Sequence, residues 1–119
     1  MNKINLAQKL SLFHEPFTPK IVGDLNDNHV KLVKVLGEFV WHSHEAEDEM
    51  FLVVKGRLTI CFRDGDVELS ENEMLIVPKG VEHKPVAMEE AHVLLIEPKT
   101  TVNTGDSPGE RTVPAPERI

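Results

Sequence analysis

The sequence contains little cysteine, few basic residues and no long apolar run. The single cysteine, Cys61, has no partner for an internal disulfide bond, so the chain is not a disulfide-stabilised secreted scaffold. The longest uninterrupted apolar run, Met50–Val54, has five residues, far fewer than the ~20 that span a bilayer. We therefore expect no membrane-spanning segment. Because the first residues lead into no apolar stretch, we also expect no secretory signal and a cytoplasmic location.

The charge balance argues against one large class of partner. Thirteen Lys and Arg residues stand against twenty Asp and Glu residues, which gives a formal net charge of −7. This charge repels phosphate backbones, so we expect no nucleic-acid partner. A length of 119 residues with 40% hydrophobic and 28% charged residues is typical of one globular domain with a single core.

The chain divides into three zones that differ in residue composition and hydrophobic pattern. Residues 1–19 form an N-terminal helix and connector, with apolar residues at helical spacing over residues 2–13 followed by two prolines. Residues 20–97 consist of short β-rich runs separated by turn residues. Residues 98–119 hold four of the eight prolines, and we interpret them as a tail or as a segment that wraps over the domain or a partner.

The middle zone predicts an all-β fold. Nine short strands in fewer than eighty residues leave no room for crossover helices, so the sheet is expected to be antiparallel, closed as a barrel or stacked as a jelly roll. Asp64-Gly65 predicts a hairpin with a type I′ turn. The expected strands are Lys20–Asp24, Val30–Leu36, Phe39–His44, Met50–Val54, Leu58–Arg63, Val67–Leu69, Met74–Val77, His83–Val86 and His92–Ile96.

The segment His42-Ser43-His44 is the first candidate for chemistry. In an extended chain, residues i and i+2 point to the same side, ~6.7 Å apart, so both imidazoles are aimed at one volume. A His-x-His pair alone is more often simple polar alternation. Glu49 strengthens the metal-site interpretation because it opens the next apolar run, whereas the neighbouring carboxylates Glu45, Glu47 and Asp48 lie in the connection.

A second segment supplies another imidazole. Pro78-Lys79-Gly80 is a turn that delivers His83 into a strand with little conformational freedom left. Three imidazoles and one carboxylate suit Fe, Mn, Ni, Co, Cu or Zn, and they suit Ca or Mg poorly.

These two segments resemble the paired motifs of the cupin superfamily. The first reads Gly37, four residues, His42-Ser43-His44, four residues, Glu49, six residues, Gly56. The second reads Asn72, five residues, Pro78-Lys79-Gly80, two residues, His83. The whole is similar to small single-domain cupins described as mannose-6-phosphate-isomerase-like.

Three departures from the family pattern leave the four donor residues in place. One residue is missing between Gly37 and His42. Asn72 replaces a glycine, and asparagine tolerates the left-handed conformation well. Ala87 stands where the motif usually has asparagine, so a supporting hydrogen bond is expected to be missing.

The resemblance implies a fold, a metal site and a class of ligand. It implies a cupin-type antiparallel jelly-roll β-barrel in which His42, His44, Glu49 and His83 bind one divalent transition-metal ion. The resulting positive site favours a small anionic organic acid or sugar derivative, with isomerase or oxygenase chemistry. The alternative is a non-catalytic module that binds or senses a metal or small molecule. Beyond the metal-binding residues, the only candidates for an acid or base are Lys34 and Glu38.

The phase of the strand around Gly37 decides whether those two side chains point into the barrel or out of it. Strict alternation from His42 places Lys34 and Glu38 inside, whereas a bulge at Gly37 places Val33 and Val35 inside instead. We favour the bulge because two buried valines cost less than a buried Lys–Glu pair.

Alternation also makes predictions about the outer face, the core and the thiol. Phe39, Trp41 and Ser43 are expected to face outward, against the N-terminal helix or the second subunit of a homodimer. Cys61 is expected to be an inert small hydrophobe. Candidates for the core or pocket wall are Phe51, Val53, Leu58, Ile60, Phe62, Leu75, Val77, Leu94 and Ile96.

Overall fold

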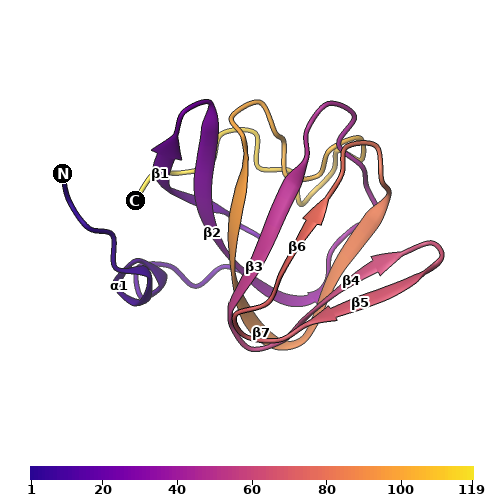
Figure 1. The fold of residues 1–119 in the computed structure, drawn as a ribbon, viewed down its shortest axis with the longest axis horizontal. Coiled ribbons are helices and arrows are strands. Elements are labelled where there is room, and N and C mark those ends of the chain that lie inside the picture. The colour runs from indigo at the N-terminus through magenta and orange to yellow at the C-terminus, as the bar shows by residue number, and fades with distance from the viewer.

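The computed structural model describes residues 1–119 as a β-barrel with one short helix (Figure 1). Every β pairing between named strands is antiparallel, which confirms the predicted all-β architecture. The elements are α1 (Leu6–Leu10), β1 (Lys20–Leu25), β2 (Asn28–Glu38), β3 (Glu49–Lys55), β4 (Leu58–Phe62), β5 (Gly65–Leu69), β6 (Met74–Val77) and β7 (His83–Pro98).

The long strand β7 joins the parts of the sheet. The strand order is β1-β2-β7-β3-β6, and the β4–β5 hairpin pairs with the first residues of β7. The sequence predicted two strands, His83–Val86 and His92–Ile96, where the structure has one. A bulge explains the difference. Val35 pairs with Ala91 and Gly37 with Ala87, so the exposed residues 88–90 of β7 lie opposite a single residue of β2, and the strand continues on both sides of them.

The bulge at Gly37 is confirmed. The β2–β7 register shifts between Val35 and Gly37, and Gly37 has a φ of 83°, which favours glycine. Val33 and Val35 consequently lie in the barrel interior. Lys34 points to the outer side, where its ammonium group donates to the Phe13 carbonyl over 2.7 Å.

The predicted β4–β5 hairpin is also confirmed, but its turn type is not. Phe62 pairs with Gly65, so the two loop residues are Arg63 and Asp64, and neither has the positive φ that a type I′ turn needs. Gly65 begins β5 with a φ of 146°, so the glycine is needed just after the turn.

The interior core contains most of the expected residues, with one error of phase. Phe51, Val53, Leu58, Ile60 and Val77 are buried in it, and Phe62 and Leu75 pack against it. Leu94 and Ile96 lie outside this interior core, and Leu94 packs instead against the second core described below. In β7 the inward positions are Ala91, Val93, Leu95 and Glu97, in the same phase as the buried His83, Pro85 and Ala87 that precede residues 88–90.

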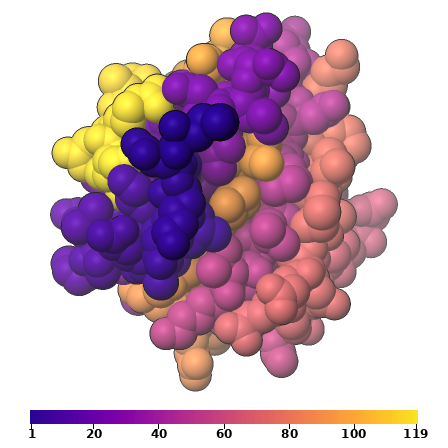
Figure 2. All heavy atoms as spheres, turned by 60° about the vertical axis from the view of Figure 1, so that its left-hand side comes forward, coloured from indigo at the N-terminus to yellow at the C-terminus, as the bar shows by residue number.

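A second, smaller core lies outside the barrel under the N-terminal segment. Leu10 and Phe13 pack on Val22 and Leu32 there. Figure 2 shows this indigo segment lying across the strands beside the yellow C-terminal residues. Helix α1 is shorter than the predicted helix over residues 2–13, because it starts at its N-cap Asn5 and ends at Ser11. No helix in the structure has the length and apolar character needed to cross a membrane.

The C-terminal segment, residues 99–119, runs back along the barrel to β1. Ile21 donates its N–H to the Glu117 carbonyl over 2.9 Å and accepts from the Ile119 N–H over 3.0 Å. Arg118 adds a two-pronged contact with Asp24. On the way, residues 101–107 pass beside the segment that carries His42 and His44.

Candidate metal centre

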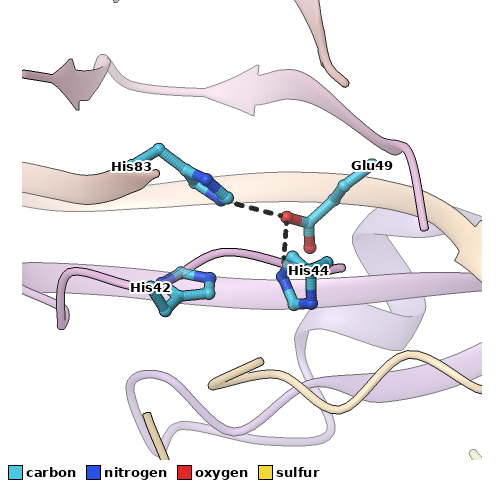
Figure 3. Close-up of side chains that lie close together, drawn as sticks. All are labelled: His42, His44, Glu49 and His83. Atoms are coloured by element: carbon cyan, nitrogen blue, oxygen red, sulfur yellow. Dashed lines mark ion pairs between the residues drawn. The ribbon is translucent and has the colours of Figure 1, made fainter. Parts of the chain in front are cut away.

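Four buried side chains converge inside the barrel. One ligand atom from each of His42, His44, Glu49 and His83 lies within 4.8 Å of the others (Figure 3). All four residues are buried, with 4% exposure or less. The structure therefore brings together every residue that the sequence assigned to a metal site.

The histidine pair is held without a regular strand. The sequence predicted a strand over Phe39–His44, but residues 39–48 are irregular apart from one backbone bridge between His42 and His83. In that bridge each N–H donates to the other's carbonyl, over 3.0 Å from His42 and 2.9 Å from His83. The Gly80 N–H donates to the His44 carbonyl over 2.8 Å. The Pro78–Gly80 turn and the start of β7 thus place both imidazoles.

The C-terminal segment fixes the same histidine pair from the other side. The Asp106 carboxylate accepts from the Ser43 N–H over 2.8 Å and from the Ser43 hydroxyl over 3.2 Å. The Asp106 N–H donates back to the Ser43 carbonyl over 3.1 Å. These contacts lower the pKa of Asp106. Ser43 is therefore locked between the two histidines that flank it.

Backbone carbonyls select the ring nitrogen that faces the cluster. Nδ1 of His42 donates to the Val40 carbonyl over 2.9 Å, and Nδ1 of His83 donates to the Val81 carbonyl over the same distance. Each proton is therefore on Nδ1, which leaves the lone pair of Nε2 directed at the cluster. This is the arrangement that a metal-binding imidazole needs.

The convergent atoms lack partners within the chain. Nε2 of His44, Nε2 of His83 and Oε1 of Glu49 are buried without a hydrogen-bond partner. Oε1 of Glu49 lies 3.4 Å from each of these two nitrogens. Neighbouring donors on an ion with bonds of ~2.1 Å lie ~3 Å apart, close to this spacing. Because buried polar atoms are rarely left unpaired, the donor set fits a metal ion.

Protonation states agree with this fit. Burial lowers the pKa of His42 to about 4, so its imidazole is neutral near pH 7. Burial alone would raise the pKa of Glu49, but the neighbouring Glu97, His44 and His83 side chains lower it well below its usual range. The site therefore offers a neutral His42 imidazole and an ionised Glu49 carboxylate, the forms that bind divalent cations.

Comparison with known proteins assigns the chain to a family. Residues 31–98 match the family model of the Cupin domain (Cupin_2). The chain belongs to the cupin family. It is 34% identical over 84 residues to the protein YdbB of Bacillus subtilis (strain 168), a match that covers 70% of this cupin and 72% of YdbB.

Solved cupin structures share its fold. A cupin-2 domain containing protein from Shewanella frigidimarina NCIMB 400 is 50% identical, with a TM-score of 0.80 over 81% of this chain and 94% of that one. Protein NMB1881 from Neisseria meningitidis is 34% identical, with a TM-score of 0.75 over 82% of this chain and 100% of that one. The expected cupin-type jelly-roll barrel is therefore confirmed.

A narrow pocket adjoins the four side chains of this cupin. Its volume is about 50 Å³, enough for a few water molecules or the end of a small ligand. Most of its walls are phenylalanine, valine, leucine and proline side chains. The polar groups that line it are His42, Glu49, Glu97 and Asn103.

Sequence reasoning missed two charged residues beside the site. Lys31 and Glu97 are each 1% exposed and form an ion pair in the interior, with 2.8 Å between Nζ and Oε1. The favoured bulge at Gly37 contained the signal for Lys31, because the register that turns Val33 and Val35 inward also turns residue 31 inward. Glu97 follows in the same way from the inward phase of Val93 and Leu95.

The two earlier candidates for an acid or base lie elsewhere. Lys34 is under the N-terminal segment, and Glu38 is exposed and pairs with Lys84. Burial raises the pKa of the Cys61 thiol, in keeping with the inert role expected of it.

One aromatic prediction near the site was wrong. Phe39 does not face outward but lines the pocket, with its ring stacked 5.1 Å from that of Phe17. The error follows from applying strand alternation to a segment that is not a strand. Trp41 is not part of the pocket and lies under the exposed Arg63 guanidinium, 3.7 Å from its ring centre.

Proposed function

We propose that this cupin binds one divalent transition-metal ion through His42, His44, Glu49 and His83 and holds a small molecule against it. The observation that carries the proposal is the convergence of three buried donor atoms that have no partner in the chain. The donor set suits Fe, Mn, Ni, Co, Cu or Zn. When bound, the ion supplies Lewis-acid polarisation of an oxygen or, if redox-active, a site for O₂.

The chain itself contributes orientation and exclusion of water. The Val40 and Val81 carbonyls hold two imidazoles in one tautomer, and the backbone bridge between His42 and His83 fixes their separation. Phe17 and Phe39 stack along the pocket and keep its walls apolar. A ligand in this pocket therefore meets a pre-arranged polar end and an apolar wall.

The pocket favours one of the two expected ligand classes. A sugar derivative carries many hydroxyl groups, and the apolar walls would leave most of them without a hydrogen-bond partner. A small organic acid needs polar contacts only at its oxygens. The one lysine near the pocket is already paired with Glu97, so a carboxylate ligand would reach the ion directly. We propose a small organic acid, with isomerase or oxygenase chemistry.

A non-catalytic role uses the same site. The alternative function is a module that binds or senses a metal or a small molecule. The small, mostly apolar pocket supports it, because apolar walls with a few polar groups suit selective binding as well as catalysis.

Metal analysis tests the core of the proposal. The protein is purified without chelator, and bound metal is measured by plasma mass spectrometry for wild type, His83→Ala and His14→Ala. His14 is exposed and outside the cluster, so His14→Ala is a matched loss of one imidazole. We expect about one ion per chain in wild type and His14→Ala, and a large loss in His83→Ala. A wild-type protein that binds no transition metal, even after reconstitution, contradicts the proposal.

Turnover assays separate the two functions. Protein loaded with Fe(II) or Mn(II) is incubated with small hydroxy and keto acids, while oxygen uptake and product NMR spectra are recorded. Oxygen uptake indicates an oxygenase, and isomer exchange without uptake indicates an isomerase. Saturable binding of an acid without either change supports the sensing role.

We also propose that the protein forms a homodimer through an apolar face that its own chain leaves uncovered. β6 is the last strand of the sheet, and its Met74 and Ile76 are 50% and 55% exposed. They lie beside Leu52 and Met50 in the register of β3 and β6. These four residues form the β6–β3 outer face. An unpaired edge strand next to exposed apolar side chains favours pairing with a second copy.

A further inference from the structure

Lys31 and Glu97 form a charged pair in the barrel interior, one from β2 and one from β7. Their side chains are 1% exposed, and Nζ lies 2.8 Å from Oε1. Oε2 of Glu97 is buried and has no hydrogen-bond donor within reach. The pair therefore satisfies only one side of the Glu97 carboxyl group.

Glu97 lies beside Glu49, one of the donors of the candidate metal centre. In the antiparallel register of β3 and β7, Met50 pairs with Ile96, so Glu49 and Glu97 are the next neighbours along these two strands. Both residues are buried and line the same pocket. Lys31, Glu97 and Glu49 therefore follow one another in the barrel interior.

Packing alone does not account for this arrangement of Lys31, Glu97 and Glu49. A buried ion pair loses much of its attraction to the cost of removing both charges from water, and apolar residues of similar volume often serve stability as well or better. The neighbouring inward positions of the same strands are Val33 and Leu95, so the surrounding interior is already apolar. The pair is better explained by what it does to Glu49.

We infer that Glu97, anchored by Lys31, is a positioning residue that fixes the Glu49 carboxylate so that Oε1 faces the ion. Oε1 is already the oxygen that lies 3.4 Å from the imidazole nitrogens of His44 and His83. With the carboxylate held by Glu97, it acts as a one-oxygen ligand and leaves the pocket side of the ion free for a small molecule. This inference rests on the proposed metal binding.

Cobalt loading tests the inference without a substrate. Co(II) is titrated into metal-free protein, and its visible absorption spectrum and its affinity by calorimetry are recorded for each variant. In Lys31→Met/Glu97→Leu the positioning group is replaced by apolar side chains. We expect a changed spectrum and an affinity about 10- to 100-fold weaker, the usual effect of losing an outer partner of a ligand. In Glu97→Gln an amide still reaches both neighbours, so we expect the wild-type spectrum to return.

Val93→Ala is the matched control. Val93 is buried on β7 and lines the same pocket, but it bears no polar group. We expect this variant to be less stable with an unchanged cobalt spectrum, which separates a loss of packing from a loss of positioning.

The outcomes distinguish the two proposals. A wild-type protein that binds no cobalt overturns the proposed function. A wild-type protein that binds cobalt, together with a folded double variant of the same affinity and spectrum, overturns only the role of Glu97. If the double variant does not fold, Glu97→Asp is measured instead, because it shortens the reach to Glu49 and keeps a partner for Lys31. Unchanged affinity and spectrum in that variant also overturn the inference.

Discussion

His42 and His83 are paired through their backbones as well as through their rings. Each N–H donates to the other's carbonyl, and the ring centroids lie 4.4 Å apart. Residues 41 positions apart in sequence are thereby held at a separation set by peptide hydrogen bonds. Two of the four candidate donor residues are therefore held in place by the chain itself, without an ion.

Removing the metal is expected to lower the melting temperature. An ion that binds only the folded protein stabilises it by ~2.7 kcal/mol at a free concentration of 100 Kd. For a domain of this size, that corresponds to a shift of about 10 °C. The measurement is a thermal melt with and without a chelator, followed by circular dichroism.

The control for this prediction is His83→Ala, which lacks one donor of the cluster. We expect its melting temperature to respond little to the chelator, whereas His14→Ala responds like wild type. A wild-type melt that the chelator leaves unchanged contradicts the prediction.

Acid is expected to destabilise the metal-free protein through His42. Burial lowers its pKa from 6.5 in the unfolded chain to about 4 in the folded one. Between these values the unfolded state binds more protons, so stability rises with pH and is lost as the pH falls. The full effect is roughly 3 kcal/mol. Urea denaturation of chelated protein between pH 4 and pH 7 measures it.

The variant His42→Gln isolates this contribution. It removes the titrating ring, so we expect its stability to fall less steeply than that of wild type over the same pH range. Parallel curves for the two proteins would show that His42 is not responsible.

Gly105 is expected to tolerate no side chain. Its φ is 51°, and a Cβ there would overlap the Ser43 carbonyl oxygen and lie 3.2 Å from Nδ1 of His44. We expect Gly105→Ala to cost about 2 kcal/mol or more in unfolding free energy and to weaken metal binding, because the shift is transmitted to the histidine pair. The measurements are urea denaturation and metal stoichiometry.

Gly109 provides the comparison in the same segment. A Cβ at this position meets nothing within 4 Å, and its φ is not positive. Gly109→Ala should change the unfolding free energy by less than about 0.5 kcal/mol. Equal effects at the two glycines would contradict the packing argument.

The β6–β3 outer face predicts the oligomeric state. We expect wild type to sediment as a dimer and Ile76→Lys to sediment as a monomer, because a charge at the centre of this face has to be desolvated on association. Met88→Lys is the control, since Met88 is 90% exposed and lies outside the face. Analytical ultracentrifugation distinguishes the cases, and a monomeric wild type contradicts the prediction.

Local sequence was sufficient for the fold class and for the four clustered residues. Short β-rich runs with turn residues between them predicted the antiparallel sheet. Asn72 was expected to tolerate the left-handed conformation, and its φ is 68°. The His-x-His pair, Glu49 and the turn before His83 were recognisable because each depends on spacing within a few residues.

Predictions that depended on which face of a strand a residue occupies failed at two places. Phe39 was placed outside, but the irregular segment turns it into the pocket. Leu94 and Ile96 were placed in the interior core, but they alternate with Val93, Leu95 and Glu97, which are the inward residues of the same strand. A shift of one residue exchanges the two faces of a strand, and a short sequence window does not contain that register.

The sequence by itself determined the antiparallel sheet and the identity of four candidate donors, because both follow from local periodicity and residue spacing. Only the tertiary structure decided which buried residues lie next to Glu49. Lys31 and Glu97 are 66 positions apart, and their contact exists because the curvature and register of β2 and β7 direct both into one interior. Such a contact is a property of the closed barrel, in which distant segments share a small volume of low dielectric and each buried charge must find its partner there.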